Sequence, residues 1–285
     1  MSNRTETSAA KTRRTIDLYR PLAENIVYVT GQIPIDDAGS SEDVTMHNPA
    51  GLFVELFKEV LAQHGITVSG RVRTMNWRDR EIEPLDLKQW TELGFIQSRP
   101  FREIIRSVEK PSQNLYTDMI LAHVGASRDP NSNRTSEALG ITELNRFLGE
   151  AGVKRGDTIF EEGSGLSRNN LTTPNATVSL LTYMSRRPDF AIYFNALPIA
   201  GVDGTLRRRM KGTAAEGNVH AKTGTLRWAN SMSGYLTNAA GEHLVFSMML
   251  NRYQSAEPDR SKTADMDAIA AMLAKFTVRT AKKEE

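Results

Sequence analysis

Hydrophobic residues in the first part of the chain predict two short strands with a helix between them. Residues 25–34, NIVYVTGQIP, are rich in β-branched side chains and end at a proline, which predicts a strand. Residues 48–65 repeat apolar positions every three or four residues behind an Asn-Pro start and stop at a glycine, which predicts a helix. A second strand is expected at 66–69.

The middle of the chain predicts helices. Apolar stripes in 98–125 indicate two helices, and Pro111 separates them. Because the residue before a proline is pushed out of the helical region, PSQN at 111–114 is expected on a bend at the entrance of the second helix. A further amphipathic helix is expected around 141–148, and a Thr-Pro pair at 173–174 predicts the start of another.

The end of the chain predicts an antiparallel sheet and one helix. Residues 217–251 alternate as three strands, with TNAAGE at 237–242 as a hairpin turn. The helix is expected over 262–276, with Met266, Ile269, Leu273 and Phe276 inward.

These patterns divide the chain into three parts. Residues 1–72 predict a small α/β piece, and 98–280 predict the main domain. Residues 73–97 are charged and lack clear periodicity, so they are interpreted as the crossing segment between the two.

Composition narrows the classes of function. The 285 residues are 39% hydrophobic and 25% charged, enough for a substantial core. The formal charge is +2 and basic residues are scattered, so no nucleic acid partner is expected. No apolar run suits a transmembrane helix, and residues 1–15 lack the apolar core of a signal peptide. The chain has no cysteine, and its five histidines lack metal-ligand spacing, so no metal site and no cofactor are expected. Any catalytic groups are therefore expected among Ser, Lys, carboxylate and amide side chains.

Two short motifs carry candidate chemistry. Lys222-Thr223-Gly224 can be a surface turn; at a strand edge, however, its ammonium and hydroxyl suit the terminal carboxylate of an extended peptide. Ser112-Gln113-Asn114 lies on the predicted bend, where Ser112 or Asn114 can simply cap a helix. A serine hydroxyl there can also pass a proton, and an asparagine amide can bind a substrate amide.

Several longer segments carry a resemblance to one family. SQN followed far downstream by KTG resembles the second and third motifs of the serine penicillin-recognising enzymes, whose set is S-x-x-K, S-x-N and K-T-G. EEGSGLSRNNLTTP, LPIAGVDGTLRRRM and AKTGTLRWANSMSGYL are similar to segments of the D-alanyl-D-alanine carboxypeptidase/endopeptidases, the low-molecular-mass penicillin-binding proteins of peptidase family S13. SNRTET, TGQIP and LAQHGITVSG extend the resemblance over nearly the whole chain. The family's usual aspartate before GSGLSR is Glu162 here.

The resemblance implies an α+β fold of the β-lactamase/transpeptidase type. An antiparallel sheet would carry 217–251, with the last helix on one face and a helical cluster from 98 to 185 across the cleft. Residues 1–72 would be the remnant of an inserted domain. It also implies a periplasmic or cell-envelope location, peptidoglycan stem peptides ending in D-Ala-D-Ala as substrate, and β-lactams as inhibitors.

The resemblance also implies roles for single residues. Lys222 would hold the terminal carboxylate or set the protonation of Ser112, and Thr223 would donate to the same carboxylate. Gly224 would leave room for the peptide. The N–H of Thr225 would supply half of an oxyanion hole. Ser112 would relay a proton to the departing D-alanine, and Asn114 would hydrogen-bond the acyl-side amide.

The S-x-x-K nucleophile is the departure from the family pattern. It is expected upstream of the first matched segment. Two formal matches occur here: Ser8 with Lys11 has no apolar helix that would bury the lysine and lower its pKa, and Ser107 with Lys110 lies in the last turn of the helix before PSQN. Three hypotheses remain: a serine-type D-Ala-D-Ala carboxypeptidase whose nucleophile segment is missing, a peptidoglycan-binding pseudoenzyme, and a β-lactamase or esterase, which the family-specific segments disfavour.

Two other strings invite an alternative interpretation. Ser167-Arg168-Asn169 is a second S-x-N string, which its short spacing to Lys222 marks as a structural loop under the site. Arg207–Arg209 can be a carboxylate clamp, although a solvated cluster is favoured.

Overall fold

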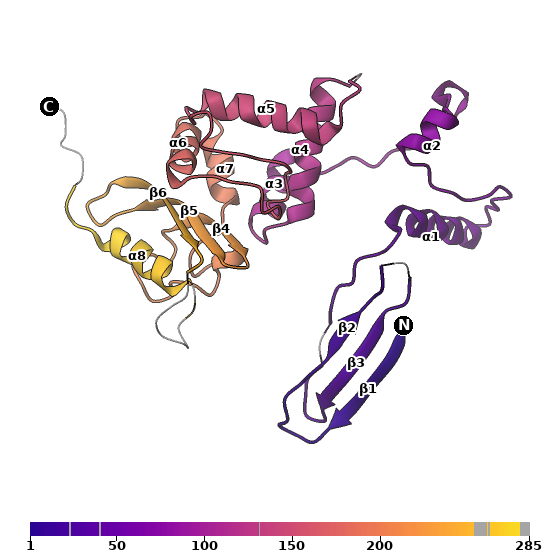
Figure 1. Ribbon diagram of the computed structural model, residues 1–285, viewed down its shortest axis with the longest axis horizontal. Coiled ribbons are helices and arrows are strands. Elements are labelled where there is room, and N and C mark those ends of the chain that lie inside the picture. The colour runs from indigo at the N-terminus through magenta and orange to yellow at the C-terminus, as the bar shows by residue number, and fades with distance from the viewer. Residues whose placement is uncertain (23, 40, 131, 254–260, 262, 280–285) are drawn as a thin grey trace. The chain divides into compact units, whose positions relative to one another are not determined.

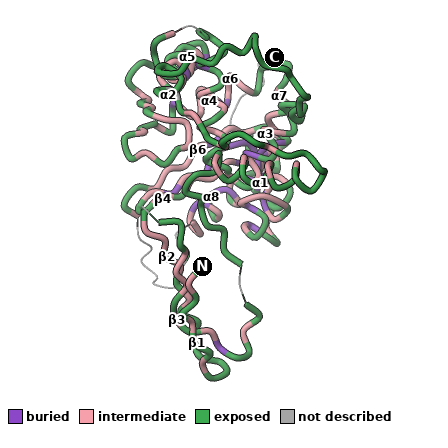
Figure 2. Tube along the Cα trace, turned by 90° about the vertical axis from the view of Figure 1, so that its right-hand side faces the viewer, coloured by how far each residue is buried: buried purple, intermediate pink, exposed green. Residues whose placement is uncertain are grey.

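The structure is a computed structural model that describes residues 1–279 apart from 23, 40, 131, 254–260 and 262. It divides into two compact units, Met1–Phe95 and Ile96–Glu285, so the division falls inside the predicted crossing segment. Figure 2 shows that buried residues gather in the second unit, whereas the three strands at the start of the chain are mostly exposed or partly buried. None of the described helices has the length and apolar character that a membrane span requires.

The first unit begins with a three-stranded sheet. Its strands are β1 (Ser2–Ser8), β2 (Asp17–Tyr19) and β3 (Tyr28–Pro34), in the order β1-β3-β2. β3 matches the strand expected at 25–34. β1 runs parallel to β3 and β2 antiparallel to it. The sequence does not predict β1 because SNRTETS contains no apolar residue, and backbone pairing to β3 is what forms it.

Helices complete the first unit. α1 (Pro49–Gln63) begins as predicted, since the Asn48 side chain accepts a hydrogen bond from the Gly51 N–H at 2.9 Å. The strand expected at 66–69 was wrong: these residues form no strand, and the Ile66 N–H donates to the Leu61 carbonyl in the turn that ends the helix. A short helix, α2 (Trp77–Ile82), and a 3₁₀ turn, η1 (Leu87–Gln89), follow.

The second unit contains the helical cluster predicted over 98–185. Within that range lie α3 (Phe101–Glu109), α4 (Asn114–Arg128), α5 (Ser136–Glu150) and α6 (Pro174–Ser185), and α7 (Phe190–Ala196) and the 3₁₀ turn η2 (Gly204–Leu206) follow beyond it. The break between α3 and α4 at Pro111 and the Thr173 cap of α6 match the prediction. The predicted apolar stripe packs only in part, because Leu115 and Met119 on α4 remain exposed.

The predicted antiparallel sheet is present in full. β4 (His220–Leu226), β5 (Ala229–Thr237) and β6 (His243–Asn251) pair in the order β4-β5-β6, which leaves β4 at an edge. The register opposes Lys222 to Ser233 and Gly224 to Ser231. Because side chains alternate between the faces of a strand, Lys222 and Gly224 share one face of β4.

The two faces of this sheet pack against different helices. α8 (Ala264–Lys275) covers one face, where Met232 and Met266 are fully buried. On the other face Tyr235 packs against α7 and donates to the Leu181 carbonyl of α6 at 2.8 Å. Figure 1 shows α8 and the helical cluster on opposite sides of the sheet.

The inward face of α8 differs from the prediction at two positions. Ile269 and Phe276 are exposed, and the small residues Ala270 and Ala274 are buried instead. The short side chains of these alanines let the helix approach the sheet closely, while Met266 and Leu273 pack inward as predicted. Residue 262, the predicted start of this helix, lies outside the described residues.

Candidate active-site groove

A cleft of about 640 Å³ opens between the edge strand β4 and the helical cluster. Its lining comes from four parts of the second unit: the end of α3, the bend and the start of α4; Phe160 and the loop 163–172; Thr205 of η2; and strands β4 to β6. All six candidate residues from the sequence lie along it: Ser112, Asn114, Lys222, Thr223, Gly224 and Thr225. The fold therefore brings the two motifs into one groove.

Lys222 spans the groove. Its Nζ donates to Ser112 Oγ at 2.6 Å and to the Thr223 carbonyl at 2.8 Å. Burial lowers the pKa of Lys222 from its ordinary value of 10.5, and the negative charge of Glu109 opposes that shift. A partly buried ammonium of this kind has one donor left for a ligand, because an ammonium carries three.

Ser112 occupies an unusual backbone conformation. Its φ of 65° lies in the left-handed region, which costs a non-glycine residue free energy and persists only where neighbouring contacts hold it. The helix-cap interpretation of this motif was wrong, since Gln113 is the N-cap of α4 without a side-chain cap bond, and Asn114 is already the first helical residue. The Ser112 hydroxyl instead faces Lys222.

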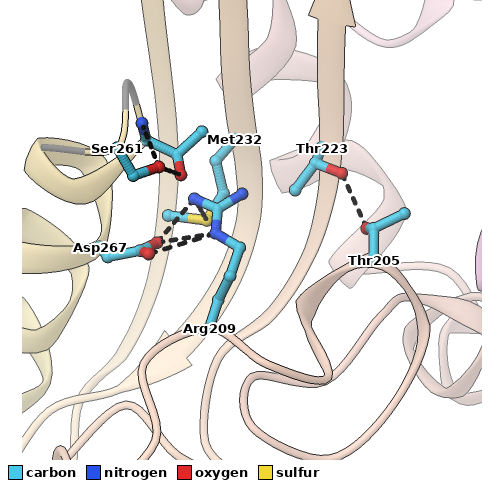
Figure 3. A network of polar contacts seen from close by, with 7 residues as sticks. Thr205, Arg209, Thr223, Met232, Ser261 and Asp267 are labelled. Atoms are coloured by element: carbon cyan, nitrogen blue, oxygen red, sulfur yellow. Dashed lines mark hydrogen bonds and ion pairs between the residues drawn. The ribbon is translucent and has the colours of Figure 1, made fainter. Parts of the chain in front are cut away.

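Thr223 and Gly224 make close contacts at the strand edge. Thr223 Oγ1 lies 2.7 Å from Thr205 Oγ1, and Figure 3 shows the two side chains pointing toward one another from β4 and from the loop below it. A Cβ added to Gly224 would lie 2.6 Å from Ser231 Oγ on β5, so a side chain there would force that serine to move. Thr225 is exposed at the same edge.

Glu162 organises the loop that forms the opposite lip. It accepts a hydrogen bond from the Ser164 hydroxyl, backbone N–H groups from Ser164, Gly165 and Ser167 at 2.7 to 3.2 Å, and the Asn170 side-chain amide at 2.5 Å. Burial acts to raise the pKa of Glu162, but these hydrogen bonds outweigh it and hold the pKa below the ordinary value. The substitution of glutamate for aspartate therefore keeps a carboxylate that folds the loop.

The second S-x-N string belongs to this loop. Ser167 Oγ and the Asn169 side-chain amide both donate to Glu161, at 3.2 Å and at 2.9 to 3.1 Å. The Gly163 N–H donates to Asp118 on α4 at 2.9 Å and fastens the loop to the helical cluster. These bonds give the string a structural function.

Neither S-x-x-K match resembles an activated serine. Ser8 ends β1 in the first unit and bonds Thr12 at 2.7 Å, while Ser107 donates to the Ile104 carbonyl of its own helix. Lys110 is held by the Leu197 carbonyl and by Asp203. In the described part of the chain, neither string brings its serine and lysine into a hydrogen bond.

Three residues around the groove were missed by sequence reasoning. Thr205 and Asp203 lie in the LPIAGVDGTLRRRM segment. This segment carries the family resemblance, but neither residue was predicted as part of the site. Glu109 ends α3, and its Oε2 is buried without a hydrogen-bond partner among the described residues. Burial raises the pKa of Glu109, against the pull of the Lys222 charge. A carboxylate in a helical stripe gives no sequence signal that it will lie next to a lysine far downstream.

Arg209 lies outside the groove. Its guanidinium pairs with Asp267 on α8 at 2.6 Å, and Figure 3 shows this pair beside Met232. For Arg209, both sequence interpretations, a substrate clamp and a solvated cluster, were therefore wrong. Across the described residues, no three His, Asp or Glu side chains gather as a metal site would require.

Comparisons with known proteins show the family to which the chain is similar. Residues 1–273 match the profile of the D-Ala-D-Ala carboxypeptidase 3 (S13) family. The D-alanyl-D-alanine carboxypeptidase of Actinomadura sp. (strain R39) is 34% identical over 97% of this chain and 50% of that protein. The D-alanyl-D-alanine carboxypeptidase DacB of Haemophilus influenzae is 30% identical over 76% of this chain and 43% of that protein. The chain thus spans about half the length of the curated relatives it matches.

A solved structure gives the same fold. Penicillin binding protein 4 (dacB) from Haemophilus influenzae superposes with a TM-score of 0.73 at 24% identity, covering 97% of this chain and 61% of that chain. At this identity the likeness speaks for the fold alone, an α+β architecture of sheet and flanking helices.

Proposed function

Because the chain belongs to the D-Ala-D-Ala carboxypeptidase 3 (S13) family, we propose that its groove serves serine-type hydrolysis of peptidoglycan stem peptides that end in D-Ala-D-Ala. The observation that carries the proposal is the 2.6 Å bond between Lys222 and Ser112, two residues 110 positions apart in the sequence. It supports a shared function of the two motifs.

The strand edge is proposed to bind the terminal carboxylate of the peptide. Lys222 supplies the positive charge and Thr223 a hydroxyl donor, and charge-assisted hydrogen bonds are the stronger kind. Because Gly224 has no side chain, the peptide backbone can run close to β4, where the Thr225 N–H would donate to the developing oxyanion.

The bend between α3 and α4 is proposed to supply the proton for the leaving amine and to bind the acyl side of the peptide. Ser112, already bonded to an ammonium, would pass a proton to the departing D-alanine amine, and the Asn114 amide would bind the peptide on the acyl side. The geometry supports this division because Ser112 and Asn114 line the groove from the bend and the start of α4, whereas Lys222 and Thr223 line it from β4.

The attacking serine is proposed to lie outside residues 1–285, on an S-x-x-K segment of the full protein. Its hydroxyl would lose a proton to the lysine of that motif, form an acyl-enzyme and release D-alanine, and water would then hydrolyse the ester. The alternative is a chain that grips D-alanyl ends without chemistry. Ser8 and Lys110, one from each S-x-x-K string, are already hydrogen-bonded to other groups. These bonds favour a nucleophile outside residues 1–285, or a chain that only binds, over a nucleophile within the chain.

Binding of the peptide is the first test. Titration of the full chain with an acetylated peptide ending in D-Ala-D-Ala should give saturable binding, and the peptide ending in L-Ala-L-Ala should bind more weakly. Lys222→Met should weaken D-Ala-D-Ala binding by about tenfold or more, because it removes the charged donor. An unchanged affinity in Lys222→Met would remove the groove from the proposal.

A covalent probe separates the enzyme from the binder. Fluorescent penicillin should form no adduct with residues 1–285, and a longer product of the same gene that carries S-x-x-K should form one, read as a mass shift. An adduct on residues 1–285 would put the nucleophile within them. A longer product with the motif and without an adduct would leave only the binder.

Two finer features accompany the proposal. One structure of penicillin binding protein 4 from Haemophilus influenzae is complexed with a novel β-lactam, which supports β-lactams as inhibitors here. A periplasmic or cell-envelope location follows from the proposed substrate, since peptidoglycan lies there.

A further inference from the structure

We propose that Lys110 and Asp203 form a positioning pair that holds the two walls of the groove in register. The inference rests on the proposed function of that groove. It assigns a task to the lysine of a formal S-x-x-K string that is not a general base. The pair would act on substrate only through Ser112 and Thr223.

The contacts of Lys110 leave its ammonium little freedom. Nζ lies 2.8 Å from Asp203 and 2.5 Å from the Leu197 carbonyl, and 12% of the side chain is exposed. Asp203 is 32% exposed and also accepts the Ile199 N–H at 2.9 Å. Because the two side chains make several hydrogen bonds and are largely shielded from solvent, the charge pair has a fixed geometry, unlike an exposed surface pair.

Each member of the pair lies two residues from a groove residue. After Lys110 the chain passes through Pro111, whose φ is restricted, to Ser112, which faces Lys222. After Asp203 it passes through Gly204 to Thr205, which contacts Thr223. A shift between Lys110 and Asp203 would therefore be transmitted to both contacts.

The backbones of the two walls also meet at this point. The Thr205 N–H donates to the Lys110 carbonyl at 3.1 Å. Gly204 has a φ of 58°, and a Cβ there would lie 2.6 Å from the same carbonyl oxygen. Only glycine permits this approach without strain, so the local sequence is suited to a tight junction between the walls.

The pair also accounts for the strained conformation of Ser112. A left-handed serine persists where surrounding contacts over-determine it. Ser112 is held on one side by the Lys222 ammonium and on the other by a proline that follows an anchored lysine. Release of Lys110 would let the bend relax and would draw the Ser112 hydroxyl away from Lys222.

The first readout needs no ligand. In the full chain labelled with ¹⁵N-lysine, the Lys222 Nζ signal, identified by its loss in Lys222→Met, reports the contact with Ser112. Lys110→Met and Asp203→Asn should each move this signal and its titration midpoint. Lys110→Arg, which keeps the cation, should restore it in part.

The second readout is affinity for the D-Ala-D-Ala peptide. Each single variant should bind about tenfold more weakly, within the range for coupled contacts, and the double variant should bind no more weakly than the singles. Additive losses would mean that the two residues do not act as a pair.

The Arg209–Asp267 pair is the matched control. It joins the same unit with 18% and 22% of its side chains exposed, but it lies at α8 and not at the groove. Asp267→Asn should lower the midpoint of thermal unfolding while the Lys222 signal and the peptide affinity stay at wild-type values.

The outcomes separate the pair from the proposed function. If Lys110→Met and Asp203→Asn behave like Asp267→Asn, the pair is only structural and the inference is overturned. If the wild-type chain binds no peptide, the proposed function fails, and the Lys222 signal alone decides the inference. If Lys110→Met does not fold, Asp203→Asn and Lys110→Arg carry the test.

Discussion

At the scale of single residues, the groove depends on the charge of Lys222. Burial lowers its pKa below 10.5, and the Glu109 carboxylate partly restores it. Because the folded pKa lies below the unfolded one, the folded chain releases this proton first as the pH rises. The ammonium that the proposed carboxylate binding needs is therefore present at neutral pH and is lost at a lower pH than that of an ordinary lysine.

The affinity for the D-Ala-D-Ala peptide should thus fall with rising pH at a midpoint below 10.5. Glu109→Gln should move this midpoint further down, since it removes the negative charge that favours the ammonium. Titrations across a pH series, alongside ¹⁵N spectra of Lys222, measure both midpoints. A midpoint that Glu109→Gln leaves in place would mean that the carboxylate does not act on Lys222.

The sequence predicts single residues where a motif names them. The six candidates were predicted from two short motifs and a family resemblance, and in the structure all six line one groove. The roles of Glu109 and Asp203 could not be predicted from the sequence, because each depends on a neighbour, Lys222 or Lys110, that only folding brings near. The left-handed backbone of Ser112 is likewise a product of tertiary contacts, since serine has no intrinsic preference for it.

At the scale of elements, α4 and α5 approach one another through glycines. A Cβ on Gly125 would lie 2.0 Å from the Ser136 carbonyl oxygen, and one on Gly140 would lie 2.3 Å from that of Leu121. The crossing fixes α4, whose first residue is the proposed substrate-binding Asn114.

Gly140→Ala should therefore destabilise the chain by about 1–3 kcal/mol, the usual cost of overpacking. Gly149→Ala is its control on the same helix: that position is exposed with open space around it, so alanine should stabilise by about 0.5–1 kcal/mol. Urea unfolding of both variants gives the two free energies. Similar values for the pair would contradict the close crossing.

Elements with clear periodicity could be predicted from the sequence, and others could not. The break at Pro111, the α1 and α6 caps and the strands β4 to β6 follow from local patterns. β1 is polar and depends on β3 for its pairing, and α7, FAIYFNA, is apolar on nearly all sides, so neither shows a period. The strand expected at 66–69 failed because the Ile66 N–H is used to close the turn after α1, and residues 66–69 form no regular structure.

At the scale of the whole molecule, every residue that lines the groove belongs to the second unit. Residues 91–100, which span the division between the units, are exposed and without regular structure. The family and the fold could be inferred from the sequence because the matched segments run along nearly the whole chain. The place of the proposed attacking serine could not be inferred from the two S-x-x-K strings, since in the described residues neither string bonds its serine to its lysine.

Limited proteolysis should consequently cut first within 91–100, where exposed backbone offers little resistance. The product that begins near residue 96 should bind the D-Ala-D-Ala peptide with the affinity of the full chain. Mass spectrometry identifies the cut and titration gives the affinity. A product that unfolds, or that binds much more weakly, would show that the groove depends on residues 1–95.

The bond between Lys222 and Ser112 has a consequence for the order of folding. It closes a loop of 110 residues, and contacts over such separations form slowly compared with a helix or a hairpin. The hairpins of β4 to β6 and the local helices can form early, before the cluster docks on the sheet. A fluorescently labelled peptide that binds only the complete groove would then report the last step of refolding. Its binding signal should rise after the far-ultraviolet circular dichroism of the chain has already recovered.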